Sequence, residues 1–137
     1  MTNALYDTGR NAFLTGGVNW TSDTIAAVLV KVTSGYTVNL ATDQYLSTIT
    51  SGNRIATFTP LASKTGVAGV ADAADVTFPT VASGPAAGAV VLYKNTGTDT
   101  TSQLIAYIDT ATGIPVTPNG GDITVSWDNG SNKIFKL

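Results

Sequence analysis

The sequence predicts a mainly β fold, an antiparallel β-sandwich or small barrel with a short N-terminal α-helix. Beyond residue 50, short segments of β-branched and apolar residues recur with turn residues between them, which is typical of strands in a sandwich or barrel. Before residue 50, one segment has its apolar residues at helical spacing. The 137 residues have the length of one domain. We therefore expect a single domain, residues 1–137, in which a helix-containing section (1–50) packs on a β body (51–137).

The helix is expected over residues 3–14. Its apolar residues lie near helical spacing, at Ala4, Leu5, Ala12 and Phe13. Asn3 is a suitable N-cap, and the pair Gly16-Gly17 is a suitable stop. Gly9, inside the segment, costs about 1 kcal/mol relative to alanine in a helix interior. A helix this short and weak depends on docking against the rest of the protein.

The strands are predicted from apolar runs. Residues 25–33 form a continuous apolar and β-branched run, which favours a strand buried on both faces. Thr42 and Asp43 are then expected to cap one further helical turn through Leu46. The remaining predicted strands are residues 54–59, 66–70, 75–81, 89–94, 103–109, 123–127 and 133–137.

Two hairpins are predicted from turn residues. The all-polar stretch between Tyr93 and Leu104 is expected to be a solvated hairpin tip. The last two strands are separated by Asn129-Gly130, a pair that tolerates the positive φ angles of a tight hairpin turn. The chain is therefore expected to end in the closing strand of a sheet.

The composition limits the kinds of binding and catalysis to be expected of the chain. Charged residues make up 12% of the chain, the net charge is −2, and the seven Lys and Arg residues are scattered. Binding of nucleic acid through its phosphates is therefore not expected. Cysteine, histidine and glutamate are absent, which removes disulfides, thiolate metal sites and the usual general bases. We expect no enzymatic activity, no catalytic residue, no cofactor and no metal.

Targeting signals are not evident in the sequence. The N-terminal segment has no basic region leading into an apolar run, so a secretory signal is not expected. The longest apolar run, residues 25–30, is far shorter than the roughly 20 residues that cross a bilayer. A cytosolic origin without a membrane span is the expectation.

Three acidic motifs are explained more simply by structural roles than by catalysis or metal binding. Residues 7–9 spell the Asp-Thr-Gly of aspartic proteases, where two carboxylates share a proton, but the following residues continue in helical register and favour an exposed helix. Residues 128–132 have the oxygen-rich composition of a calcium loop without its closing acidic residue, and a hairpin turn explains them more simply. Asp72 and Asp75 are interpreted as strand-entry and turn carboxylates, not as a catalytic pair.

Six aromatic residues form either a carbohydrate-stacking platform or anchors of the core and of interfaces. The second interpretation is favoured for all of them: Trp20, Trp127, Tyr36, Tyr45, Tyr93 and Tyr107. Tyr93 and Tyr107 fall in neighbouring strands joined by the polar hairpin, which predicts a cross-strand aromatic pair. Lys94, Lys133 and Lys136 are expected to be single solvated charges at strand ends.

Three stretches of the chain carry a resemblance to a known family. They are residues 5–30 (LYDTGRNAFLTGGVNWTSDTIAAVLV), residues 36–49 (YTVNLATDQYLSTI) and residues 104–137, of which the last is the most specific. Together they resemble small virion structural proteins encoded by tailed bacteriophages, over nearly the whole chain. The resemblance implies a particle component, foremost a head decoration (cement) protein, or else a neck, tail or fibre-associated subunit. It implies no catalytic or ligand residue.

The leading hypothesis is a non-enzymatic virion structural protein. A low-charge, Thr-rich domain suits binding through many modest contacts that gain strength by avidity. The expected partners are the major capsid protein or other virion proteins, with further copies of the chain as a dimer or trimer, in the virion and without nucleic acid or membrane. Docking is expected through Leu5, Phe13, Ile134 and Phe135. The alternatives are a module that binds glycans or a host surface, and a protease that uses the Asp-Thr-Gly triplet.

Overall fold

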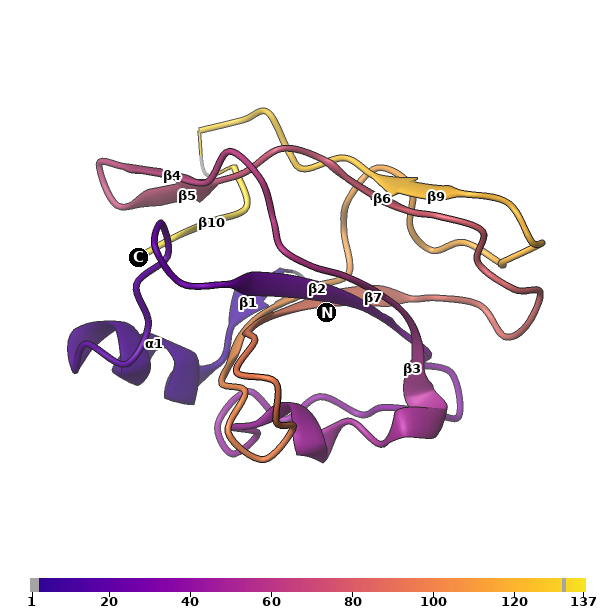
Figure 1. Cartoon of the computed structure of the whole chain (residues 1–137), viewed down its shortest axis with the longest axis horizontal. Helices are drawn as coiled ribbons and strands as arrows, with labels where there is room; N and C mark the ends of the chain where they lie inside the picture. The colour runs from indigo at the N-terminus through magenta and orange to yellow at the C-terminus, as the bar shows by residue number, and fades with distance from the viewer. Residues whose placement is uncertain (1–2, 132) are drawn as a thin grey trace.

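Ten strands, one α-helix and two short 3-10 helices form the regular structure of the computed structural model, which describes residues 3–131 and 133–137. Every strand pairing among them is antiparallel. The predicted mainly β fold with one helix near the N-terminus is confirmed. Figure 1 shows a sandwich-like arrangement of two layers, in which a five-stranded sheet lies opposite two smaller sheets.

The five-stranded sheet is the centre of the fold, with the strand order β1-β8-β7-β2-β3. Its strands are β1 (Ala4–Leu5), β2 (Ile25–Val30), β3 (Arg54–Phe58), β7 (Ala89–Lys94) and β8 (Leu104–Ile108). All six residues of β2 are buried, as the continuous apolar run predicts. Because β1 and β2 come from the first 50 residues, this section shares a sheet with later strands and does not pack on them as a separate layer.

The second layer consists of the two smaller sheets, with the orders β10-β5-β4 and β6-β9. Their strands are β4 (Thr65–Val67), β5 (Val70–Asp72), β6 (Val76–Phe78), β9 (Ile123–Val125) and β10 (Phe135–Lys136). Both strands of the β6-β9 pair alternate buried, exposed and buried residues, because one face of the pair covers the core and the other faces outward.

The core has two parts, one on each face of the five-stranded sheet. Successive residues of a strand point to opposite faces, so Ile25 and Leu29 enter the cluster between the layers, whereas Ala26 and Val30 enter the cluster on the outer face. Figure 1 shows residues 31–53, with both 3-10 helices, running below that outer face. Strands buried on both sides explain why no apolar and polar alternation is visible in residues 25–30.

The helix, α1, spans Asp7–Leu14 and begins later than predicted. Asn3 is not its N-cap, because the Asn3 side chain accepts hydrogen bonds from the backbone N–H groups of Asp109 (3.0 Å) and Thr110 (2.9 Å). Residues 4–5 instead pair with β8 as a strand. Pairing with a sheet edge overrides a weak helical preference in these residues. The helix ends just before Gly16, as the sequence predicts.

The predicted helical turn from Thr42 to Leu46 is wrong. The Asp43 carboxylate accepts hydrogen bonds from the hydroxyl of Tyr36 (2.6 Å) and the backbone N–H of Asn39 (2.9 Å), so it is bound to preceding residues and does not cap a following helix. Helical structure resumes only in the 3-10 helices η1 (Leu46–Thr48) and η2 (Ser51–Asn53).

One predicted hairpin is confirmed and the other is wrong. β7 and β8 pair across the polar loop between them, as expected. β9 and β10 do not pair with each other, because β9 pairs with β6 and β10 pairs with β5. Around Asn129 the chain does turn, and the Asp128 carboxylate accepts a hydrogen bond from the N–H of Gly130 (3.1 Å). The turn residues predict the bend correctly, but they carry no information about the partner of the strand that follows.

A further hairpin lies where a single strand was predicted over residues 66–70. β4 and β5 pair around Ala68 and Gly69, whose φ angles are +53° and +78°. Positive φ at both central residues is the geometry of a tight two-residue hairpin turn. The sequence gives little signal for it, because alanine is an unusual residue in the first of these positions.

Candidate binding surface

The Asp-Thr-Gly triplet lies in the first half of α1, not on a loop after a strand. The Asp7 carboxylate forms an ion pair with Arg10 at 2.9 Å, and the Thr8 hydroxyl donates to the backbone carbonyl of Asp43 at 2.8 Å. Gly9 is buried against β8. The helical interpretation of the triplet is therefore confirmed, although only Asp7 of its three residues is fully exposed.

The other acidic motifs belong to a strand, to the connection before β6 and to the turn near Asn129. The Asp75 carboxylate accepts a hydrogen bond from the backbone N–H of Trp127 at 3.0 Å, which supports its interpretation as a structural carboxylate. Asp72 lies in β5. In residues 128–132, Asn132 lies outside the described residues. Within the part of the chain that the structure describes, no group of three or more acidic side chains is placed to hold a metal ion.

The aromatic residues are part of the core. Five of the six are buried, and Tyr45 is half-buried. The predicted pair of Tyr93 and Tyr107 is wrong, because Tyr93 lies opposite Leu104 and Tyr107 lies opposite Val91. The register shifts between Leu92 and Tyr93, and sequence spacing alone predicts neither this shift nor the register of the two strands. Tyr107 instead contacts the ring of Tyr36, with a centroid distance of 6.3 Å. The carbohydrate-stacking interpretation gains no support from these rings.

A buried hydroxyl–carboxylate network was not predicted. The hydroxyl groups of Tyr6 and Tyr36 are 2.8 Å apart, and the Tyr36 hydroxyl donates to Asp43. Burial raises the pKa of both phenols far above their usual range, and the neighbouring Asp43 carboxylate adds to the shift. Tyr36 is 6% and Asp43 8% exposed, so a substrate cannot reach the pair. The network therefore connects α1 to residues 36–43 and has no evident catalytic use.

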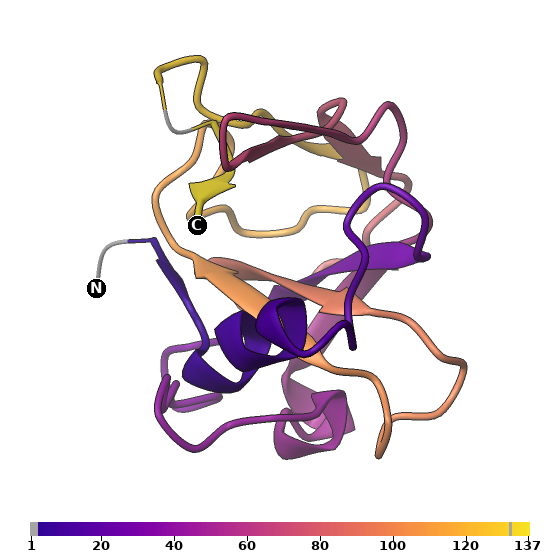
Figure 2. The ribbon, with the colours of Figure 1, turned by 90° about the vertical axis from the view of Figure 1, so that its left-hand side faces the viewer.

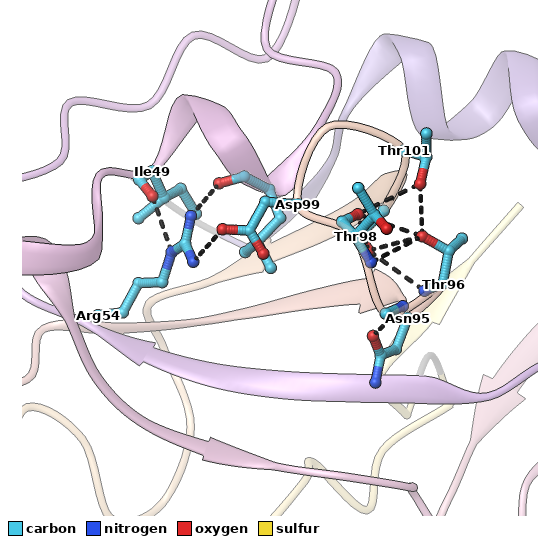
Figure 3. Close-up of polar contacts among 10 residues, drawn as sticks. Ile49, Arg54, Asn95, Thr96, Thr98, Asp99 and Thr101 are labelled. Carbon is cyan, nitrogen blue, oxygen red and sulfur yellow. Dashed lines mark hydrogen bonds and ion pairs between the residues drawn. The ribbon is translucent and has the colours of Figure 1, made fainter.

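Arg54 joins the irregular segment before β3 to the loop between β7 and β8. Its guanidinium donates to the backbone carbonyls of Ile49 (2.8 Å) and Leu46 (3.0 Å) and forms an ion pair with Asp99 at 2.7 Å. Figure 3 shows these contacts beside the threonine-rich loop, where the Thr96 and Thr101 hydroxyls are 2.6 Å apart. The loop predicted as a solvated tip is thus held by its own hydroxyl groups and by Arg54.

Lys94 is not the single solvated charge that was predicted. Its ammonium lies 3.2 Å from the carboxylate of Asp23 and donates to the backbone carbonyl of Gly17 at 2.9 Å. Lys64 donates to the backbone carbonyl of Asp23. Partial burial alone raises the pKa of Asp23, but the hydrogen bond from the N–H of Asn19 and the two ammonium groups outweigh it and lower that pKa overall. These contacts hold the loop before β2 in place.

One groove has the character of a protein-binding surface. It has a volume of about 430 Å³ and lies between the C-terminal end of α1, the β4-β5 hairpin and β10. We call it the apolar groove, and its larger lining residues are Phe13, Val18, Trp20, Val70, Phe135 and Leu137. Figure 1 shows α1, the β4-β5 hairpin and the C-terminus at the same end of the molecule.

Aromatic packing forms the base of the apolar groove. The ring of Phe135 contacts Trp20 edge-on at a centroid distance of 5.2 Å and contacts Phe13 at 5.8 Å. The Trp20 indole donates to the backbone carbonyl of Asp72 at 3.3 Å, and the N–H of Leu137 donates to Gly69 at 2.9 Å. These contacts fix β10 beside the hairpin, so the groove has a rigid base.

One of the most exposed large apolar side chains lines this groove. In the described part of the chain, Leu14 (85% exposed), Val67 (71%) and Leu137 (59%) are the exposed large hydrophobic residues. Leu137 lines the groove, whereas Val67 lines a separate hollow with Thr65 and Asp72. Leu14 follows Phe13 at the end of α1. A groove that combines an aromatic lining with an exposed leucine is typical of an interaction surface.

The four residues predicted as interface lie beneath or beside this surface. Leu5, Ile134 and Phe135 are 4%, 5% and 8% exposed, and they belong to the core cluster between the layers. Phe13 is half-buried and packs against the same cluster. Their contact with a partner stays a prediction. The sequence pattern singles out apolar segments, but it does not separate the buried positions from their exposed neighbours Leu14 and Leu137.

Comparison with known proteins finds no family model and no curated sequence that matches the chain. Over residues 3–131 and 133–137, no helix is long and apolar enough to cross a membrane. The surface of the protein is therefore the main indication of its function.

Proposed function

We propose that the chain is a bacteriophage virion structural protein, a capsid decoration (cement) protein that stabilises the head through protein–protein contacts. The observation that carries the proposal is the apolar groove itself, which Phe13, Trp20 and Phe135 line together with the exposed side chain of Leu137. Exposure of such a patch to water is unfavourable, and covering it with a complementary apolar surface lowers the free energy. A position elsewhere in the particle, as a tail, neck or fibre-associated subunit, uses the same surface and is the alternative.

Two further features support an adhesive role. Few charges need to be desolvated when this surface is covered, since charged residues are only 12% of the chain. The groove base is rigid, so binding does not require ordering of a flexible segment. A single contact of this size is weak, but many copies on one shell bind by avidity. The resemblance of residues 5–30, 36–49 and 104–137 to phage virion proteins points in the same direction.

The test is the position of the chain in purified particles from the phage or prophage that encodes it. We expect repeated, stoichiometric density for the chain on the head in a cryo-electron microscopy reconstruction, and lower heat resistance of particles assembled without it. Density on the tail or neck would favour the alternative. Absence of the chain from purified particles would refute both.

Surface variants test the role of the apolar groove. Leu137→Ser removes an exposed apolar side chain that lines the groove without changing the core, so the variant should fold and bind shells more weakly. Ala82→Ser is the control, because Ala82 is exposed in the loop after β6 and does not line the groove. Equal occupancy of the two variants on shells would show that the groove is not the docking surface.

A further inference from the structure

A second groove lies on the other side of β10 and differs in charge. It has a volume of about 320 Å³ and is lined by residues of β1, α1, β8 and the C-terminal segment. We call it the basic groove. Figure 2 shows β1 and the C-terminal segment on the same side of the molecule, one in each layer. The groove therefore opens where the two layers of the sandwich separate.

The charges around the basic groove are mostly positive. Arg10, Lys133 and Lys136 line it, which is three of the chain's seven cationic residues, and Asp128 is its one acidic lining residue. The lining thus carries a formal charge of +2 (three cations and one carboxylate) on a chain whose net charge is −2. The average composition of this acidic protein does not account for such a local excess of positive charge, which favours a negatively charged occupant.

The two lysines carry this charge without an internal partner. Arg10 is already paired with Asp7 at 2.9 Å, so its charge is partly neutralised. Over the described residues, neither Lys133 nor Lys136 forms an ion pair or donates a side-chain hydrogen bond. In contrast, Lys94 and Lys64 both bind groups of their own chain. The ammonium groups of Lys133 and Lys136 are therefore available to carboxylates from outside.

The base of the basic groove consists of buried apolar residues beneath a mostly polar lining. Leu5 and Ile134 line it and are almost fully buried, and Ala106 and Ile108 contribute from β8. An occupant that fits needs negative charges toward the lysines and small side chains toward this base. An extended peptide that alternates acidic and small apolar residues has both features, because its successive side chains point to opposite sides.

We propose that the basic groove binds an extended acidic peptide segment of a partner protein, with its carboxylates beside Lys133 and Lys136. A nucleic acid is a poorer fit, because its affinity grows with the number of phosphates neutralised and only two unpaired cations are present. The groove is small and partly apolar, which suits a few residues of peptide. The proposal does not depend on a virion location, so it is tested on the isolated protein.

The experiment measures binding of a fluorescein-labelled peptide in which aspartate alternates with valine, by fluorescence anisotropy with the full chain at low salt. We expect binding that weakens as salt is added, and at least several-fold weaker binding of the matched peptide with asparagine in place of aspartate. The double variant Lys133→Gln, Lys136→Gln should bind the aspartate peptide about tenfold more weakly. Lys31→Gln, a matched loss of charge outside the groove, should change binding by less than about twofold.

A variant that is expected to bind more tightly tests the proposal independently of folding, because loss of folding would weaken binding. Asp128→Asn removes the negative charge of the groove lining and keeps the oxygen that accepts from Gly130, so it should tighten binding of the aspartate peptide about twofold. Equal binding of the aspartate and asparagine peptides, or unchanged binding by the double lysine variant, would overturn the proposal. Tighter binding of a single-stranded oligonucleotide than of the aspartate peptide would overturn it in favour of nucleic acid.

Discussion

Gly9 of α1 lies directly against the backbone of Leu104 in β8. A Cβ atom added at Gly9 would stand 2.7 Å from the carbonyl oxygen of Leu104, closer than such atoms approach in proteins. The helix therefore docks on the sheet through a position that has no side chain. This contact explains how a short helix with an unfavourable glycine forms at all, because its stability comes from packing and not from propensity.

The substitution Gly9→Ala distinguishes helix propensity from the close backbone contact, because the two change the free energy of unfolding in opposite directions. Helix propensity alone predicts that alanine stabilises the protein by about 1 kcal/mol. The close contact predicts the opposite, a loss of about 1–3 kcal/mol, because backbone atoms must shift to make room. Urea unfolding of wild-type and variant protein measures the difference. Gly52→Ala is the control, because a Cβ at Gly52 meets nothing within 4 Å and its φ is not in the left-handed region.

The β4-β5 hairpin offers a stabilising substitution. Ala68 has a φ angle of +53°, which alanine adopts only at a cost, and Gly69 follows it with +78°. Ala68→Asn creates the Asn-Gly pair that such turns favour and should stabilise the protein by about 0.5–1 kcal/mol. Thermal unfolding measures the gain. Gly69→Ala, which places a second alanine in the left-handed region, should destabilise the protein, and a stabilised Gly69→Ala variant would contradict this account of the turn.

Arg54 should contribute more through its backbone contacts than through its ion pair. Its guanidinium is mostly buried and satisfies the carbonyls of Leu46 and Ile49, whereas the carboxylate of Asp99 is about half exposed. Arg54→Met should therefore cost about 1–3 kcal/mol. Asp99→Asn should cost less than about 1 kcal/mol, because a half-exposed ion pair is worth little in water. Chemical unfolding of both variants tests this order, and the reverse order would show that the ion pair dominates.

The sequence predicts those parts of the fold that depend on local patterns. The continuous apolar run of β2 and the polar loop between β7 and β8 are found where expected, because burial on both faces and turn composition both leave a local signature. The partners of β9 and β10 are not predictable in this way. Their pairing with β6 and β5 depends on contacts with strands about 50 to 65 residues away in the chain, as the register pairs Val76 with Val125 and Ala71 with Phe135.

The candidate site was predicted only in part for the same reason. Phe13 and Phe135 come from the two ends of the chain, and the sequence singles out both as apolar residues for docking. Their contact at 5.8 Å, and the position of Leu137 beside it, depend on the way β10 joins the β5 edge. Periodicity assigns a residue to a face, but it does not say which faces another strand will cover.

Asp23 gives the stability a dependence on acidic pH. Its pKa is lowered in the folded protein, since the N–H of Asn19 and the ammonium groups of Lys94 and Lys64 together outweigh the opposing effect of burial. A lowered folded pKa contributes stability that is fully present above the unfolded value, about pH 4, and is lost as the pH falls through the folded value. The stability difference between wild-type and Asp23→Asn should therefore shrink between pH 7 and pH values below about 4. Urea unfolding across this range measures it, and a difference independent of pH would contradict the assignment.

The buried tyrosines determine the alkaline limit of stability. Burial raises the pKa of Tyr6 and Tyr36 far above the usual value of about 10, and the Asp43 carboxylate adds to the shift. A raised folded pKa contributes stability that is present below the unfolded value and is lost as the pH rises above it. We expect the protein to lose stability above about pH 10, with both phenols ionising only as it unfolds. Absorbance at the phenolate band and circular dichroism, recorded together, should change at the same pH.

Substitution of Tyr36 tests the same network at neutral pH. Tyr36→Phe removes the hydroxyl that donates to Asp43 at 2.6 Å and leaves a buried carboxylate with one fewer donor, so it should cost about 1–3 kcal/mol. Tyr45→Phe is the matched control, because Tyr45 is half-buried and its hydroxyl accepts a hydrogen bond from the neighbouring Gln44, so its loss should stay below about 1 kcal/mol. Equal losses for the two variants in urea unfolding would mean that the carboxylate does not depend on the Tyr36 hydroxyl. A larger loss for Tyr36→Phe shows that the buried hydroxyl–carboxylate network of Tyr6, Tyr36 and Asp43 contributes to stability.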